Sequence, residues 1–228
     1  MDETESNDTF SDADVLSSGT QLTGQLSSST DWDVFAITAA SAGTISVNFD
    51  APTNSSYSNY FYVSLYDAEG NVLAAQRTGK DTSFDVGVES AGTYYAGLTT
   101  ADFHSSEQYG ITVTTEAGSV SNVETESNDT FSDADVLSSG TQLTGQLSSS
   151  TDWDVFAITA ASAGTISVNF DAPTNSSYSN YFYVSLYDAE GNVLAAQRTG
   201  KDTSFDVGVE SAGTYYAGLT TADFHSSE

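Results

Sequence analysis

The sequence predicts an all-β protein made of two tandem jelly-roll-like β-sandwich domains. Residues 3–107 recur letter for letter as residues 124–228, at an offset of 121, and a repeat of this length has the usual size of one domain. Within each copy, short runs of alternating apolar and polar residues are separated by Gly, Ser, Asn and Asp, a pattern typical of strands and turns. We therefore expect a first sandwich over residues 3–115, a linker over residues 116–123 and a second sandwich over residues 124–228.

The first copy contains about eight runs that favour strands. After an acidic opening, residues 9–16 are expected to form a turn around Phe10 and Leu16. The expected strands then lie at residues 22–26, 31–37, 43–49, 61–66, 72–76, 84–88, 93–99 and 108–115. Gly70 supplies the positive φ that a tight turn over residues 67–71 needs. This many short strands with almost no helix indicate two packed sheets.

The second copy ends before the counterpart of the last expected strand. Residues 108–115 have no repeat before the chain ends at Glu228, so the second sandwich is expected to lack its final strand. Two interpretations stay open. Either the chain simply stops short of that strand, or the repeating unit runs from Gln108 to Glu228 and its first strand completes a neighbouring domain. Strand donation of the second kind builds filaments.

The strongly negative net charge of the chain argues against negatively charged partners. The chain has 32 acidic residues against four basic ones, for a net charge of -28. Nucleic acid is excluded as a partner because binding phosphates requires Lys and Arg, and an anionic membrane surface is disfavoured for the same reason. No apolar run is long enough to insert into a membrane. Because cations and salt relieve self-repulsion of this size, the composition fits a calcium-rich extracellular medium or cell surface, or a hypersaline one.

Each copy opens with oxygen side chains spaced to converge on one cation. Glu, Glu, Asn and Asp occupy positions 1, 3, 5 and 6 of an extended segment, and Ca²⁺ takes about six to eight oxygens in irregular geometry. Two further carboxylates alternate on one expected strand and so share a face. The alternative, a solvated run of charges, stays open. The candidate calcium ligands of the first copy are Glu3, Glu5, Asn7, Asp8, Asp31 and Asp33, and those of the second are Glu124, Glu126, Asn128, Asp129, Asp152 and Asp154.

The sequence does not predict an enzyme. The same acids could form the carboxylate pair of a glycosidase, but nothing else in the chain indicates a sugar cleft with a raised-pKa acid. His104 and His225 are the only histidines. No nucleophile motif accompanies them, and a zinc site would need more His or Cys than the chain contains.

Five short motifs follow one another along the first copy. They are Glu-x-Glu-x-Asn-Asp at residues 3–8, Asp-Trp-Asp-Val-Phe at 31–35, Leu-Tyr-Asp-Ala-Glu-Gly-Asn-Val-Leu at 65–73, Ala-Gly-Thr-Tyr-Tyr at 91–95 and Tyr-Gly-Ile-Thr-Val at 109–113. In this order they resemble the bacterial pre-peptidase C-terminal domain, a family that includes the collagen-binding domains of clostridial collagenases. The resemblance implies a secreted jelly roll that binds calcium through the acidic opening and Asp31 or Asp33. It also implies that Tyr109 supports the site, and the second copy has no counterpart of this residue.

The sequence is compatible with two functions. The favoured one is a non-catalytic, extracellular, calcium-stabilised repeat that serves as a structural or adhesive element of a surface array or filament, with further copies of itself as partners. An identical neighbour favours this role because a lone binding module does not need one. The alternative is an accessory module of a secreted peptidase that targets a collagen-like or polysaccharide polymer. Its candidate contact residues are exposed aromatic side chains, namely Tyr57, Tyr60, Tyr62, Tyr66, Tyr94 and Tyr95.

Overall fold

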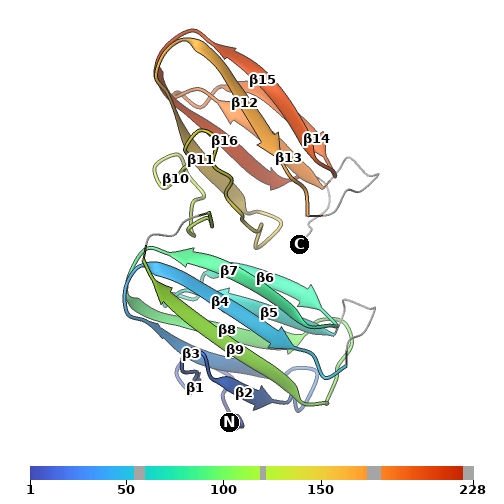
Figure 1. Cartoon of the computed structure of the whole chain (residues 1–228). Helices are drawn as coiled ribbons and strands as arrows, with labels where there is room; N and C mark the ends of the chain where they lie inside the picture. Colours follow the sequence, from blue (N-terminus) through green and yellow to red (C-terminus); the bar gives the residue numbers. More distant parts are fainter. Residues whose placement is uncertain (54–59, 119–121, 174–180, 223–228) are drawn as a thin grey trace. The chain divides into compact units, whose positions relative to one another are not determined.

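The chain folds into strands, turns and irregular segments. The structure is a computed structural model that describes residues 1–53, 60–118, 122–173 and 181–222 (Figure 1). These residues include no helix, so the all-β prediction is confirmed. No helix long and apolar enough to cross a membrane occurs among them. The chain divides into two compact units, Met1–Glu126 (unit 1) and Ser127–Glu228 (unit 2).

Unit 1 is a sandwich of two sheets. Its strands are β1 (Asp14–Val15), β2 (Gln21–Gly24), β3 (Trp32–Ala39), β4 (Gly43–Asp50), β5 (Phe61–Tyr66), β6 (Val72–Thr78), β7 (Thr82–Val88), β8 (Gly92–Thr100) and β9 (Tyr109–Ala117). One sheet has the order β1-β3-β8-β5-β6 and the other the order β2-β9-β4-β7 (Figure 1). Strand β9 therefore lies inside its sheet, between β2 and β4.

The core of unit 1 lies between these two sheets. Because successive side chains of a strand point to opposite faces, Ile45, Val47 and Phe49 of β4 all point inward and are at most 1% exposed. Strand β9 adds Tyr109, Ile111 and Val113 to the same core in the same way. Side chains from the opposite sheet, including Phe35 and Leu65, complete it.

The predicted turn at residues 9–16 is only partly a turn. Its end forms β1, which pairs in parallel with β3, so that Asp14 lies opposite Phe35. Phe10 packs on the outer face of the sheet, with ring centroids 4.5 Å from Tyr95 and 5.3 Å from Trp32. The difference from the prediction arises because a two-residue parallel pairing depends on a distant strand and leaves no local pattern.

Unit 2 repeats most of this arrangement. Its strands are β10 (Asp135–Val136), β11 (Trp153–Ala160), β12 (Gly164–Phe170), β13 (Phe182–Tyr187), β14 (Val193–Thr199), β15 (Thr203–Val209) and β16 (Gly213–Thr221). Strands β10-β11-β16-β13-β14 form one sheet, whereas β12 pairs with β15 alone within the described part of the unit. Residues 142–145, which repeat the sequence of β2, belong to none of these strands.

Candidate metal centre

Backbone hydrogen bonds hold the acidic opening of unit 1 against the sandwich. The Thr23 N–H donates to the carbonyl of Met1 (2.7 Å), and the Glu3 N–H donates to the carbonyl of Thr23 (2.9 Å). Further along, the Val34 N–H donates to the carbonyl of Asn7 (3.1 Å). The opening therefore runs first beside β2 and then beside β3, where the Asp-x-Asp pair lies.

The carboxylates of this region come together in two overlapping groups. Carboxylate oxygens of Glu3, Glu5 and Asp33 lie within 4.8 Å of one another, and so do those of Glu5, Asp8 and Asp31. Glu5 belongs to both groups, so the five acids form one continuous cluster, which we call the unit 1 cluster. Carboxylates at this spacing repel each other, and either protons or a bound cation must compensate the charge.

Asp33 is the most deeply buried member of the unit 1 cluster. Its side chain is 0% exposed, and its Oδ1 has no hydrogen-bond partner within the described residues. Its Oδ2 accepts a hydrogen bond from the Tyr109 hydroxyl, which also lies 3.1 Å from Glu3 Oε2. One oxygen of a buried carboxylate is thus left for another partner, and a carboxylate without one is costly to bury.

Burial also changes the acidity of the cluster. It is the main cause that raises the pKa of Asp33 to about 8, and the negative charges of Glu3, Asp31 and Glu5 raise this pKa further, against the hydrogen bond from Tyr109. Burial is also the main cause that raises the pKa of Glu3 and that of Glu5. Without a cation the inner carboxylate therefore holds a proton near neutral pH, and a cation that binds there replaces it.

Asp31 behaves differently from Asp33. Burial alone would raise its pKa, but hydrogen bonds, of which those from Ser27 are the largest contribution, outweigh burial and lower it. The backbone N–H of Ser27 donates directly to Asp31 Oδ2. Near neutral pH the cluster without a cation thus contains an ionised carboxylate, that of Asp31, and a protonated one, that of Asp33, because their pKa values are shifted in opposite directions.

The side chain of Asn7 is buried. It is 0% exposed, and neither its amide nitrogen nor its amide oxygen has a hydrogen-bond partner in the described parts of the chain. Leaving a buried amide unsatisfied costs about 1–3 kcal/mol. Because Asn oxygens are ordinary ligands of Ca²⁺, an amide next to Glu5 and Asp8 in the sequence fits the first copy's predicted ligand set.

The same positions are buried in unit 2. Asn128 and Asp154 are 0% exposed and Asp152 is 6% exposed, and the amide atoms of Asn128 again have no hydrogen-bond partner among the residues described. Burial raises the pKa of Asp152, and Asp129 raises it further. Glu124 and Glu126 are counted with unit 1, and their part in a second site remains a prediction.

Several hydrogen bonds of the acidic opening were not predicted from the sequence. The backbone N–H of Gln25 donates to Glu3 Oε1 (2.6 Å), and the N–H of Thr4 donates to Asp14 Oδ2 (2.6 Å). Backbone donors leave no signal in a sequence because every residue except proline carries one.

Three of the six tyrosines proposed for polymer binding are buried or packed against Phe10. Tyr94 is 7% exposed, and its hydroxyl donates to the carbonyl of Ser90 (3.1 Å). Tyr66 and Tyr95 pack against Phe10, and Tyr57 lies outside the described residues. Contacts within unit 1 therefore explain the positions of Tyr66, Tyr94 and Tyr95, and no ligand is needed to explain them.

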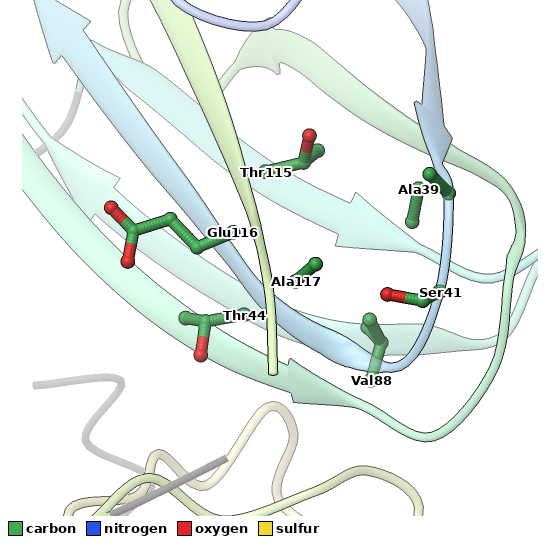
Figure 2. Close-up of a pocket in the computed structure, with 8 residues that line it drawn as sticks. Ala39, Ser41, Thr44, Val88, Thr115, Glu116 and Ala117 are labelled. Atoms are coloured by element: carbon green, nitrogen blue, oxygen red, sulfur yellow. The ribbon is translucent and has the colours of Figure 1, made fainter. Parts of the chain in front are cut away.

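Within the described residues, neither His104 nor a small pocket of unit 1 brings catalytic groups together. His104 Nε2 lies 2.9 Å from the carbonyl oxygen of Leu26, and His225 lies outside the described residues. A small pocket at the end of β9 is lined by Ala39, Ala40, Ser41, Thr44, Val88, Thr115, Glu116 and Ala117 (Figure 2). Glu116 is the one ionisable side chain in that lining.

Fold and site together define a class: a β-sandwich module whose opening segment contributes to an acidic cluster that could hold a metal ion. No family model matches the chain, and a search of curated proteins finds no match.

Several solved structures are weakly similar to this chain. The pre-peptidase C-terminal domain of a collagenase from Bacillus anthracis is 22% identical, with 44% of this chain and 93% of that one covered and a TM-score of 0.35. The CUB1-EGF-CUB2 region of human MASP-1/3 is 12% identical, with 90% and 94% covered and a TM-score of 0.26. The corresponding domains of rat MASP-1 are 12% identical, with 93% and 95% covered and a TM-score of 0.29. These TM-scores are all below 0.5, so the function proposed next is argued from the geometry of this chain.

Proposed function

We propose that the chain is a non-catalytic, calcium-stabilised β-sandwich repeat that serves as a structural or adhesive element of an extracellular array or filament. The observation that supports calcium is the coincidence of clustered carboxylates with two buried oxygens, Asp33 Oδ1 and the Asn7 amide oxygen, that have no hydrogen-bond partner among the described residues. Calcium accepts mixed carboxylate and amide oxygen ligands without demanding a regular geometry. The ligand set we propose is Glu3, Glu5, Asn7, Asp8, Asp31 and Asp33, with Tyr109 orienting Asp33.

Such an ion would act mechanically. It would replace the proton on Asp33, cancel the repulsion among the acids and tie the opening segment to β3. The segment would then lose the freedom that a charged, partly exposed peptide otherwise has. The identical acids of the second copy are proposed to act in the same way, from Glu124 to Asp154.

A structural role has more support than targeting of a polymer. The perfect repeat suits an array, in which identical surfaces recur. Three of the six tyrosines that a collagen-like or polysaccharide ligand would contact, Tyr66, Tyr94 and Tyr95, are already packed against Phe10 or buried. Membership of the pre-peptidase C-terminal family and an extracellular location belong to this proposal.

Isothermal titration of the chelator-treated chain with CaCl₂ at constant ionic strength tests the metal site. We expect binding with a dissociation constant of the order of 0.1–1 mM, the range of extracellular calcium modules, and a higher melting temperature in calcium. The double variant Asp33→Asn/Asp154→Asn should lose most of the binding. The matched control, Glu89→Gln/Glu210→Gln, removes two exposed charges outside the clusters and should bind as the parent does.

Two outcomes would overturn the proposal. Absence of binding heat together with an unchanged melt in excess chelator would reject calcium. Electron microscopy addresses assembly, since filaments or arrays are expected in calcium and only separate particles in chelator. Dispersed particles under both conditions would reject the structural role.

A further inference from the structure

Phe10 attaches the acidic opening of unit 1 to the outer face of a sheet. Its ring packs on three others, with centroid distances of 4.5 Å to Tyr95, 5.3 Å to Trp32 and 5.5 Å to Tyr66. The four rings are only partly buried, and none of them belongs to the core between the two sheets. The opening segment therefore has an apolar attachment of its own, separate from the core.

Two glycines leave room for this packing. A Cβ on Gly97 would lie 2.7 Å from Trp32 Nε1 and 2.9 Å from Tyr66 Cε2. A Cβ on Gly70 would lie 3.0 Å from Phe10 Cε2. Because glycine lets another group approach the backbone closely, the rings lie directly against the main chain at both places. The backbone around the Phe10 ring is thus adapted to hold it.

The second copy has the same packing in unit 2. Phe131 lies 4.5 Å from Tyr216, 5.3 Å from Trp153 and 5.5 Å from Tyr187, measured between ring centroids. A Cβ on Gly191 would lie 3.1 Å from Phe131 Cε2. The buried cores of the two units differ in extent, whereas the ring packing does not. The packing is therefore a property of the opening segment and the sheet it covers.

A short turn connects the Phe10 ring to the candidate ligands of the opening. Asn7 and Asp8 lie three and two positions before Phe10. The Asp12 N–H donates to the carbonyl of Thr9 (3.1 Å), and Thr9 Oγ1 donates to Asp12 Oδ2 (2.7 Å). Since these bonds close the turn, fixing the ring also restricts the positions that the Asn7 and Asp8 oxygens can reach.

The tryptophan of the packing is adjacent to the other candidate ligands. Trp32 follows Asp31 and precedes Asp33 in the chain, and because side chains alternate along a strand, its ring lies on the face opposite to the Asp33 carboxylate. In unit 2 the corresponding Trp153 N–H donates to Asp129 Oδ1 (3.4 Å). The ring packing therefore joins the segment that carries the first ligands to the strand that carries the others.

We propose that Phe10 and Phe131 are positioning residues for the candidate calcium sites of the first and second copies. The ring holds the turn after the Asn and Asp of the opening, so that their oxygens lie beside the carboxylates that flank the tryptophan. Neither ring touches the ion. Without this attachment the ion alone would have to order the opening segment, and the entropy lost in doing so would weaken its binding. The inference deepens the calcium site proposed above and rests on it.

Thermodynamic reciprocity gives this role a spectroscopic signature. A ring that strengthens binding of the ion must itself be held more tightly once the ion is bound. Trp32 and Trp153 are the only tryptophans of the chain, and each packs against one of the two phenylalanines. Calcium should therefore lower the acrylamide quenching of tryptophan fluorescence, with the same midpoint as the binding heat.

The test compares variants of the full chain titrated with CaCl₂ by calorimetry at constant ionic strength. Phe10→Ala/Phe131→Ala should raise the dissociation constant by about tenfold or more, because the lost ring contacts correspond to a factor of this size. Calcium should also no longer change the acrylamide quenching of this variant. Phe10→Leu/Phe131→Leu keeps an apolar side chain without the ring contacts and should raise the dissociation constant by about threefold. This milder variant decides the question if the alanine chain does not stay folded.

A matched control removes equivalent rings far from the acidic residues. Phe84 on β7 and Phe205 on β15 are also partly buried and pack against the cores of their units. Strand β7 lies at the opposite edge of its sheet from β2, beside which the acidic opening runs. Phe84→Ala/Phe205→Ala should lower the melting temperature but leave the dissociation constant and the calcium-dependent quenching unchanged.

The possible failures can be told apart. A parent-like dissociation constant in the Phe10→Ala/Phe131→Ala chain, or an equal loss of affinity in the Phe84→Ala/Phe205→Ala control, would overturn the positioning role and leave the calcium site in place. Tryptophan quenching that calcium does not alter in the parent would overturn it as well. A parent chain that binds no calcium would instead reject the proposed calcium site, and this inference with it.

Discussion

The hydroxyl of Tyr109, the first residue of β9, donates to the carboxylate of Asp33 on β3, 76 positions away in the sequence. The bond joins the two sheets of unit 1 at the base of its acidic cluster. The last strand of the sandwich and the candidate metal centre are consequently parts of one structure, and a change in either should be detected at the other.

Replacing Tyr109 with Phe should destabilise unit 1. The variant keeps the ring in the core but leaves Asp33 without its hydroxyl partner, at an expected cost of about 1–3 kcal/mol in the free energy of unfolding. Urea unfolding in EDTA measures this change in the free energy of unfolding. Tyr95→Phe, which removes a hydroxyl on the outer face of the same sandwich, is the control and should change little. Equal midpoints for the two variants would contradict the role given to the Tyr109 hydroxyl.

The stability of the calcium-free chain should fall as the pH rises from about 4 to about 8. The pKa of Asp33 is raised from 3.8 to about 8 in the folded state, so the folded chain binds this proton more tightly than the unfolded chain does. Its contribution is complete below the unfolded pKa and is lost as the pH rises through the folded one. Melting temperatures in EDTA at constant ionic strength test this.

Asp33→Asn supplies the control for the pH dependence. An amide does not titrate, so the variant should lose much of the slope between these pH values, whereas Glu89→Gln should keep it. In calcium the trend should reverse, because the ion requires the ionised carboxylate and binds more tightly as the pH rises. A parent and an Asp33→Asn chain with the same slope in EDTA would refute the assignment.

Replacing Asn7 with Ala should affect the chain mainly when calcium is present. In EDTA the side chain has no hydrogen bond to lose within the described structure, so only packing is removed and the melting temperature should change modestly. In saturating calcium a ligand is lost, and the stabilisation by the ion should shrink. Paired melts with and without calcium measure the difference, with the exposed Asn48→Ala as the control. An equal loss under both conditions would mean that Asn7 only fills space.

Gly43 and Gly164 should respond differently to the same substitution. In Gly43→Ala the new methyl group meets the Glu116 carbonyl, with the Cβ at 1.9 Å, so β9 must shift, at a cost of about 1–3 kcal/mol or more. In Gly164→Ala no atom of the described residues lies within 4 Å of the new Cβ, and no loss is expected. Differential scanning calorimetry compares the two, and similar effects would contradict the difference between the two units.

Local patterns in the sequence accounted for much of the architecture. The run predicted over residues 43–49 is β4 (Gly43–Asp50), and the run over residues 61–66 is β5 (Phe61–Tyr66). Alternation identifies such strands because neighbouring side chains face opposite sides, whatever the strand pairs with. The spacing of the acidic residues likewise predicted Glu3, Glu5 and Asp8 as candidate metal ligands.

The sequence by itself determined the all-β class, the repeat and the charge that a cation would relieve, since each is a property of composition or of residues close together in the chain. The tertiary structure alone decided the parallel pairing of β1, the burial of Asn7 and the raised pKa of Asp33. These depend on which distant segments exclude water from a side chain. The two copies illustrate this difference: Gly43 and Gly164 have the same local sequence, yet within the described parts of the chain a neighbouring strand encloses only Gly43.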